Sequence, residues 1–181
     1  KKVWTGIASV IAALCLPFIL IIVCVLSIAS GGADHNRSAV RLAFEGGTIP
    51  SSMPADYWEY IGQMQESFGE LDTVLGEIDN MTEGELTDRY LVKAVFYSLY
   101  FGADKVRLET SDYQRFAECF VNYKERTRTI ETPNGSESEE TYVVAVAVTD
   151  KVELFEKIST DYGKSLTYEQ QSNAVNVWYL A

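Results

Sequence analysis

The feature that most constrains this chain is an uncharged, almost wholly apolar run from Val3 to Ala29, preceded by Lys1 and Lys2. A helix rises about 1.5 Å per residue and the hydrocarbon core of a bilayer is about 30 Å thick, so the run is long enough to cross a membrane. A buried helix of a globular domain normally keeps a polar stripe, which this run lacks. The pattern predicts a transmembrane anchor over residues 1–30.

The two lysines predict that the amino terminus is cytoplasmic and that the rest of a single-pass cell-membrane protein is extracytoplasmic. The alternative is a cleaved signal peptide, but its apolar stretch would be roughly 7 to 15 residues long, about half the length of this run. We expect the anchor to contact the lipid bilayer through apolar and interfacial side chains along its length: Trp4, Ile7, Leu14, Pro17, Phe18, Ile21 and Val25.

Charge and cysteine content limit the function of the remaining chain. The whole chain carries a net charge of -11, and without the first two lysines 13 basic residues face 26 acidic ones. Such an acidic domain is a poor candidate for direct nucleic-acid binding, which needs clustered Lys and Arg. Two of the three cysteines lie within the apolar run and Cys119 is alone outside it, so no disulfide framework is expected.

Hydrophobic spacing predicts a mostly helical domain after a linker. Residues 31–53 combine a juxtamembrane linker with a short helix-like stretch, and an amphipathic helix of about 25 residues should follow Pro54. Residues 91–101 are nearly all apolar and predict a buried helix, with a strand as the alternative, and Thr87-Asp88 resembles its cap. Another helix is expected from Ser111 to Phe120.

The clearest β signal comes next in the chain. Residues 121–130 alternate, residues 132–136 have turn composition and residues 141–148 are strongly β-prone, so we expect a long hairpin. Two closing helices should follow, over residues 151–162 and 167–180, the second with a capping box. The predicted fold class is α+β: one amino-terminal transmembrane helix, then a small, mostly helical domain with a long hairpin over residues 54–181.

Few residues outside the anchor could carry chemistry. His35 and Cys119 are the only histidine and the only cysteine there. His35 falls in the juxtamembrane linker and Cys119 on a separate element between aromatic residues, so we expect the two to be apart and to form neither a thiol dyad nor a metal site. Glu45, before a glycine pair, is the one candidate general acid for a lysozyme-type site; its alternative is a solvated helix-terminal residue. No cofactor motif is present in the sequence.

Two surface features have competing interpretations. Tyr57, Trp58 and Tyr60 could form an exposed contact patch, although packing into the core at the helix start is the favoured interpretation. The charged run over residues 124–128 is better explained as a cross-strand salt lattice with Glu139 and Glu140 than as a ligand clamp.

Three segments resemble a known family: SGGADHNRSAVRLAFEGGTIP, LVKAVFYSLYFGAD, and FAECFVNYKERTRT followed by TYVVAVAV. Together they are similar to the amino-terminal, membrane-anchored part of NlpC-type cell-wall hydrolases encoded on conjugative mobile elements of Gram-positive bacteria. In that family the catalytic Cys and His lie in a later domain, so the resemblance assigns no catalytic residue to this sequence.

The resemblance implies a non-catalytic, membrane-proximal module of a cell-wall hydrolase associated with a conjugative type IV secretion system. Such a module would position the peptidoglycan-opening activity or dock proteins of the secretion channel, and it could contact peptidoglycan. Two alternatives remain open from the sequence: a divergent lysozyme-like glycosidase that uses Glu45, and a structural scaffold domain of the channel without a hydrolase.

Overall fold

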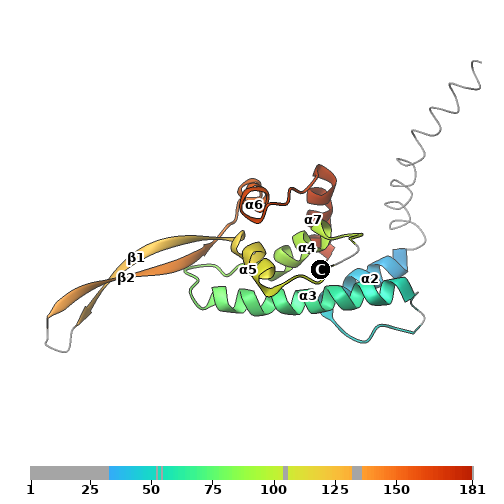
Figure 1. Cartoon of the computed structure of the whole chain (residues 1–181), viewed down its shortest axis with the longest axis horizontal. Coiled ribbons are helices and arrows are strands. Elements are labelled where there is room, and N and C mark those ends of the chain that lie inside the picture. Colours follow the sequence, from blue (N-terminus) through green and yellow to red (C-terminus); the bar gives the residue numbers. More distant parts are fainter. Residues whose placement is uncertain (1–32, 52, 54, 104–105, 132–135, 181) are drawn as a thin grey trace, which may run out of the picture.

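The computed structural model describes residues 33–51, 53, 55–103, 106–131 and 136–180. Within these ranges the chain forms six α-helices, a short π-helix and a two-stranded antiparallel sheet. Figure 1 shows the helices gathered in one body, from which the two strands extend along the long axis of the molecule. The elements in chain order are α2 (Ala33–Glu45), α3 (Ala55–Asp79), α4 (Arg89–Leu99), α5 (Thr110–Glu118), β1 (Val121–Glu131), β2 (Glu137–Ala147), α6 (Lys151–Lys157), the π-helix η1 (Ile158–Tyr162) and α7 (Tyr168–Leu180).

The predicted fold class needs one correction. The α+β domain of helices and a hairpin is present, but none of the helices in the described ranges combines the length and the apolar composition that crossing a membrane requires. The predicted fold class, which included a transmembrane helix, is therefore wrong as stated. The described helices are amphipathic or short, and each contains charged side chains. The expected anchor residues lie outside the described residues: Trp4, Ile7, Leu14, Pro17, Phe18, Ile21 and Val25.

The longest helix, α3, supports the domain along its length. It contains 25 residues, as its periodicity predicts. Its inner face is an almost unbroken apolar stripe at three- and four-residue steps, which is why it forms one straight support rather than two short helices. The buried residues of this stripe are Ile61, Met64, Phe68, Leu71, Val74, Leu75 and Ile78.

The buried centre of the core is α4, which is a helix rather than a strand. The predicted cap forms: the Asp88 carboxylate accepts hydrogen bonds from the backbone N–H groups of Tyr90 and Leu91, at 2.9 and 3.0 Å. Phe96 has no exposed surface, and its ring lies among aromatic side chains of α3, α4 and α5. This aromatic cluster joins the three helices into one core.

The hairpin pairs Val121 with Ala147 at its base and Glu131 with Glu137 near its tip, through an uninterrupted register. Its base is tied to the helical body. The segment after α3 forms a parallel bridge with β2, in which Ala145 donates to the Met81 carbonyl and accepts from Glu83 N–H, both at 2.8 Å. The distal half of the hairpin extends beyond these ties (Figure 1).

The closing helices follow the predicted bounds with one difference. The first continues from α6 into the π-helix η1 and ends at Gly163, whose φ of 80° is the left-handed geometry that glycine adopts readily. The second begins with the expected capping box, in which Thr167 N–H donates to Gln170 and Gln170 N–H donates to the Thr167 hydroxyl, at 2.9 and 3.2 Å.

Candidate functional site

The candidate acid Glu45 lies at the last residue of α2 with its side chain about half exposed. Its carboxylate accepts a hydrogen bond from Arg41 Nε at 2.7 Å, one helical turn earlier. A glycosidase acid needs an apolar surrounding, whereas the Glu45 carboxylate lies beside the Arg41 guanidinium and solvent. This geometry supports the solvated helix-terminal interpretation of Glu45.

Cys119 lies at the end of α5 and is completely buried. Its thiol lies 3.4 Å from the Arg115 carbonyl oxygen, and burial raises the pKa of the thiol to about 11. A thiol with a raised pKa is protonated at neutral pH and is a poor nucleophile. The side chain of His35 lies outside the described part of the structure, so the expected separation of the two residues stays a prediction.

The predicted contact patch divides in the structure. The side chains of Tyr57 and Trp58 are exposed at the start of α3. Tyr60 is half-buried and its ring makes edge contacts with Tyr97 and Phe101. Burial raises the pKa of both tyrosines, that of Tyr97 to about 12, so both phenols stay protonated at neutral pH. Sequence spacing did not reveal Phe101, which the end of α4 brings beside Tyr60.

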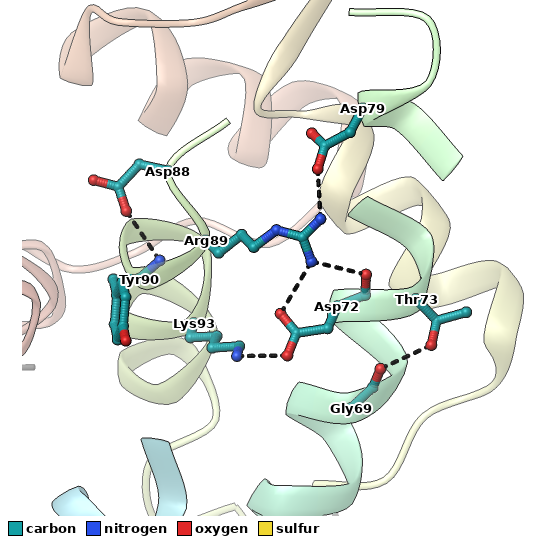
Figure 2. Close-up of polar contacts among 8 residues, drawn as sticks. All are labelled: Gly69, Asp72, Thr73, Asp79, Asp88, Arg89, Tyr90 and Lys93. Atoms are coloured by element: carbon teal, nitrogen blue, oxygen red, sulfur yellow. Dashed lines mark hydrogen bonds and ion pairs between the residues drawn. The ribbon is translucent and has the colours of Figure 1, made fainter. Parts of the chain in front are cut away.

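A charged cluster joins α3 to the start of α4 (Figure 2). Lys93 Nζ lies 2.7 Å from one oxygen of Asp72, and Arg89 lies 3.5 Å from the other oxygen and donates to the Asp72 carbonyl at 3.1 Å. Arg89 also forms an ion pair with Asp79. The two cations and two carboxylates neutralise one another, so no net charge is left to attract a charged ligand. We interpret this cluster as a structural clamp between the two helices.

The surface has a recess of about 310 Å³ beside Cys119. The two cations that line it are bonded to the backbone of the domain. Lys157 donates to the Val121 carbonyl and to Asn122, and Arg115 donates to backbone carbonyls of η1. A smaller recess of about 180 Å³ lies between Leu86 and Trp178, below the volume usual for small-molecule sites. Across the described ranges, no three His, Cys, Asp or Glu side chains are arranged to hold a metal ion.

The hairpin presents two different faces, because side chains alternate along each strand and paired residues share a face. One face carries the three basic residues of β1, which are Lys124, Arg126 and Arg128. Arg126 pairs with Glu83, and Arg128 pairs with Glu140, both at 2.7 Å. Only the second of these pairs belongs to the salt lattice expected from the sequence. The opposite face carries four exposed glutamates without an ion-pair partner in the described part of the chain: Glu125, Glu131, Glu137 and Glu139.

The outer edge of β2 is open beyond its base. Because the backbone of Ala145 bonds outward to Met81 and Glu83, the alternation of antiparallel pairing turns every second residue of β2 outward as well. The backbone N–H and C=O groups of Val143, Thr141, Glu139 and Glu137 therefore point away from β1. Nothing in the described ranges pairs with them. This edge is about 20 Å long at the usual rise of a strand.

The composition of this edge is acidic. Segment 127–141 contains one arginine and four glutamates, which gives the distal arm a net charge of −3. The β2 edge is longer than the residue pattern predicts, because that pattern begins the strand only at Thr141. The alternating Ser-Glu pattern over residues 136–140 is the signal that could have extended it.

Comparison of the chain with models of known protein families, with curated proteins and with solved structures finds no match.

Proposed function

We propose that this domain is a non-catalytic docking module of a cell-wall hydrolase associated with a conjugative type IV secretion system, acting on the extracytoplasmic side of the cell membrane. The family resemblance of three segments supports the biological setting. The observation that carries the docking role is the open, acidic edge of β2, held away from the helical body by an anchored base.

The partner we propose is an extended segment with basic side chains in a protein of the secretion channel. Such a segment could add a strand to β2, since an exposed edge offers a row of unpaired donors and acceptors. This pairing would continue the one that Met81–Glu83 begins at Ala145. Basic side chains on the added strand would lie beside Glu137 and Glu139, which attract them.

Self-association through the same edge is disfavoured. Two β2 strands placed edge to edge would bring the glutamates of one copy next to those of the other, and like charges on neighbouring strands destabilise the pairing. The acidic composition therefore selects for a basic partner and against a second copy of this chain.

The docking role is tested by photocrosslinking in cells that carry the mobile element. A photoreactive amino acid replaces Val143, which is half exposed and lies on the β2 edge. The proposal predicts a crosslink to a secretion-channel protein. A matched pair of variants sharpens the test, because Thr141 and Thr127 are cross-strand partners whose backbone N–H groups both point outward, on opposite edges.

Proline removes an N–H donor and is tolerated on sheet edges. Thr141→Pro should abolish the crosslink, and Thr127→Pro should preserve it. A crosslink that survives Thr141→Pro, or crosslinked products without any channel protein, would contradict the proposal.

The non-catalytic role has its own test. The purified full chain in detergent should release neither reducing sugars nor muropeptides from peptidoglycan. Glycan cleavage by the wild-type chain that disappears in Glu45→Gln would overturn this role and establish the lysozyme-like alternative.

A further inference from the structure

The start of α3 and the end of α4 carry an arc of aromatic side chains, which we name the aromatic end: the exposed Tyr57, Trp58 and Phe101, and the half-buried Tyr60. Tyr57, Trp58 and Phe101 are 37%, 41% and 55% exposed, although residues of this size are mostly buried in globular domains. At about 100° per residue, Trp58, Tyr57 and Tyr60 follow one another around the helix, and Phe101 continues the arc beside Tyr60. The contact of Phe101 with Tyr60 brings the two elements together at this end.

The aromatic end lies where the undescribed amino-terminal chain joins the domain. Helices α2 and α3 run in the same direction: Ala39 packs with Ile61, the Leu42 carbonyl accepts from Gln65 at 2.9 Å, and Phe44 contacts Phe68. The first residues of both helices consequently lie at one end of the molecule, opposite the hairpin (Figure 1). The sequence that leads into Ala33 contains the apolar run Val3–Ala29.

We infer that the aromatic end contacts the interfacial layer of a lipid bilayer. An uncharged apolar run of this length partitions into lipid, and its attachment to α2 brings the bilayer surface to this end of the domain. Trp and Tyr favour the headgroup layer, because their rings are apolar while their N–H and O–H groups find polar partners there. The acidic composition disfavours broader contact with an anionic membrane, which limits the contact to this end.

The arrangement also sets the direction of the hairpin. With the aromatic end at the lipid surface, the acidic arm extends away from the membrane along the long axis of the molecule (Figure 1). The inference shares the membrane location with the proposed function but does not depend on the β2 edge. Its test contains no channel protein, so its failure and the failure of the docking proposal are distinguishable.

The test is fluorescence quenching of the full chain reconstituted in phosphatidylcholine vesicles whose acyl chains carry bromine close to the headgroup. The chain has three tryptophans, so Trp4→Phe with Trp178→Phe leaves Trp58 as the only emitter. The matched control keeps Trp178, which donates to Asp88 at the opposite end of α4. Trp58 should lose emission relative to vesicles without bromine, and Trp178 should not.

A second measurement uses the wild-type chain. Hydroxyl-radical oxidation followed by mass spectrometry should show that vesicles protect Tyr57, Trp58 and Phe101, relative to the chain in short-chain zwitterionic detergent. Tyr168 and Tyr179, which are 86% and 73% exposed, provide the reference rate. Equal quenching of Trp58 and Trp178, or aromatic-end oxidation that keeps its ratio to the reference tyrosines in vesicles, would overturn the inference.

Discussion

Replacing Phe96 with alanine tests the core directly. The Phe96 side chain is fully buried, and its ring centroid lies 4.6 Å from Tyr100, 5.4 Å from Phe116 and 6.3 Å from Phe68. These neighbours belong to the end of α4, to α5 and to α3, so the lost ring leaves a cavity where three elements meet. Large-to-small substitutions at such sites cost about 3 to 5 kcal/mol, because part of the cavity remains after relaxation.

The expected cost is a large fraction of the about 5 to 15 kcal/mol that stabilises a domain. For a domain of this size it corresponds to a loss of roughly 6 to 20 °C in melting temperature. The assay is denaturant unfolding of the full chain in detergent, followed by near-ultraviolet circular dichroism. Tyr168→Ala, at an exposed position, is the matched control. A loss for Phe96→Ala no greater than that of the control would refute the assignment of the core.

Three further predictions concern the clamp, two glycines and the buried thiol. Lys93→Met should lower the free energy of unfolding by about 1 to 3 kcal/mol, because the Lys93 side chain is only 12% exposed and its loss leaves Asp72 with one ion-pair partner fewer. The control, Arg107→Met, removes an exposed ion pair worth less than about 1 kcal/mol. Equal costs of the two variants in denaturant unfolding would contradict the clamp. Gly163→Ala should destabilise the chain by about 1 kcal/mol, because the φ of Gly163 is 80°. Gly76→Ala, inside α3, should stabilise the chain by a similar amount, because an added Cβ there meets open space. Calorimetry should therefore find a lower melting temperature for Gly163→Ala and a higher one for Gly76→Ala. Iodoacetamide should modify Cys119 slowly in the native chain at pH 8 and quickly in denaturant, since burial raises the pKa of the thiol to about 11. Equal rates of modification, measured by peptide mass spectrometry, would disprove the burial of Cys119.

Local chemistry predicted several elements well. The cap at Asp88 and the box formed by Thr167 and Gln170 depend on residues within four positions of one another, so the sequence alone specifies them. The inner face of α3 follows from its apolar spacing for the same reason. Such signals persist in the structure because no distant contact has to supply them.

Features set by distant contacts were harder to predict. Residues 91–101 predict a buried helix, but Leu91 and Leu99 are only half-buried, whereas Val92 and Ala94 are fully buried. Which positions are buried depends on the packing of α4 against both α3 and α7, the second of which is distant from it in the sequence. Arg126 pairs with Glu83 instead of a cross-strand glutamate, since the segment after α3 approaches β2. The strand β2 begins at Glu137, where pairing with β1 overrides a weak local preference for β structure.

The candidate site likewise combines features that local sequence predicts with features that depend on distant contacts. The first turn of α3 was recognised as a possible contact patch from its composition, but Phe101 joins it only through the packing of α4 beside α3. The open edge of β2 depends on the strand register and on the pairing of Ala145, which no residue pattern specifies. Glu45 was a candidate from its place before two glycines, and its ion pair with Arg41 is a contact within one helix.

Conjugative transfer is the most direct measure of the docking role assigned to the β2 edge. A strain that lacks the gene is complemented with the wild-type chain, Thr141→Pro or Thr127→Pro, each at matched protein levels, and the frequency of transfer is counted. The docking role predicts that Thr141→Pro lowers transfer to the level of the uncomplemented strain, while Thr127→Pro supports transfer as the wild type does. Equal transfer by the two proline variants would contradict it.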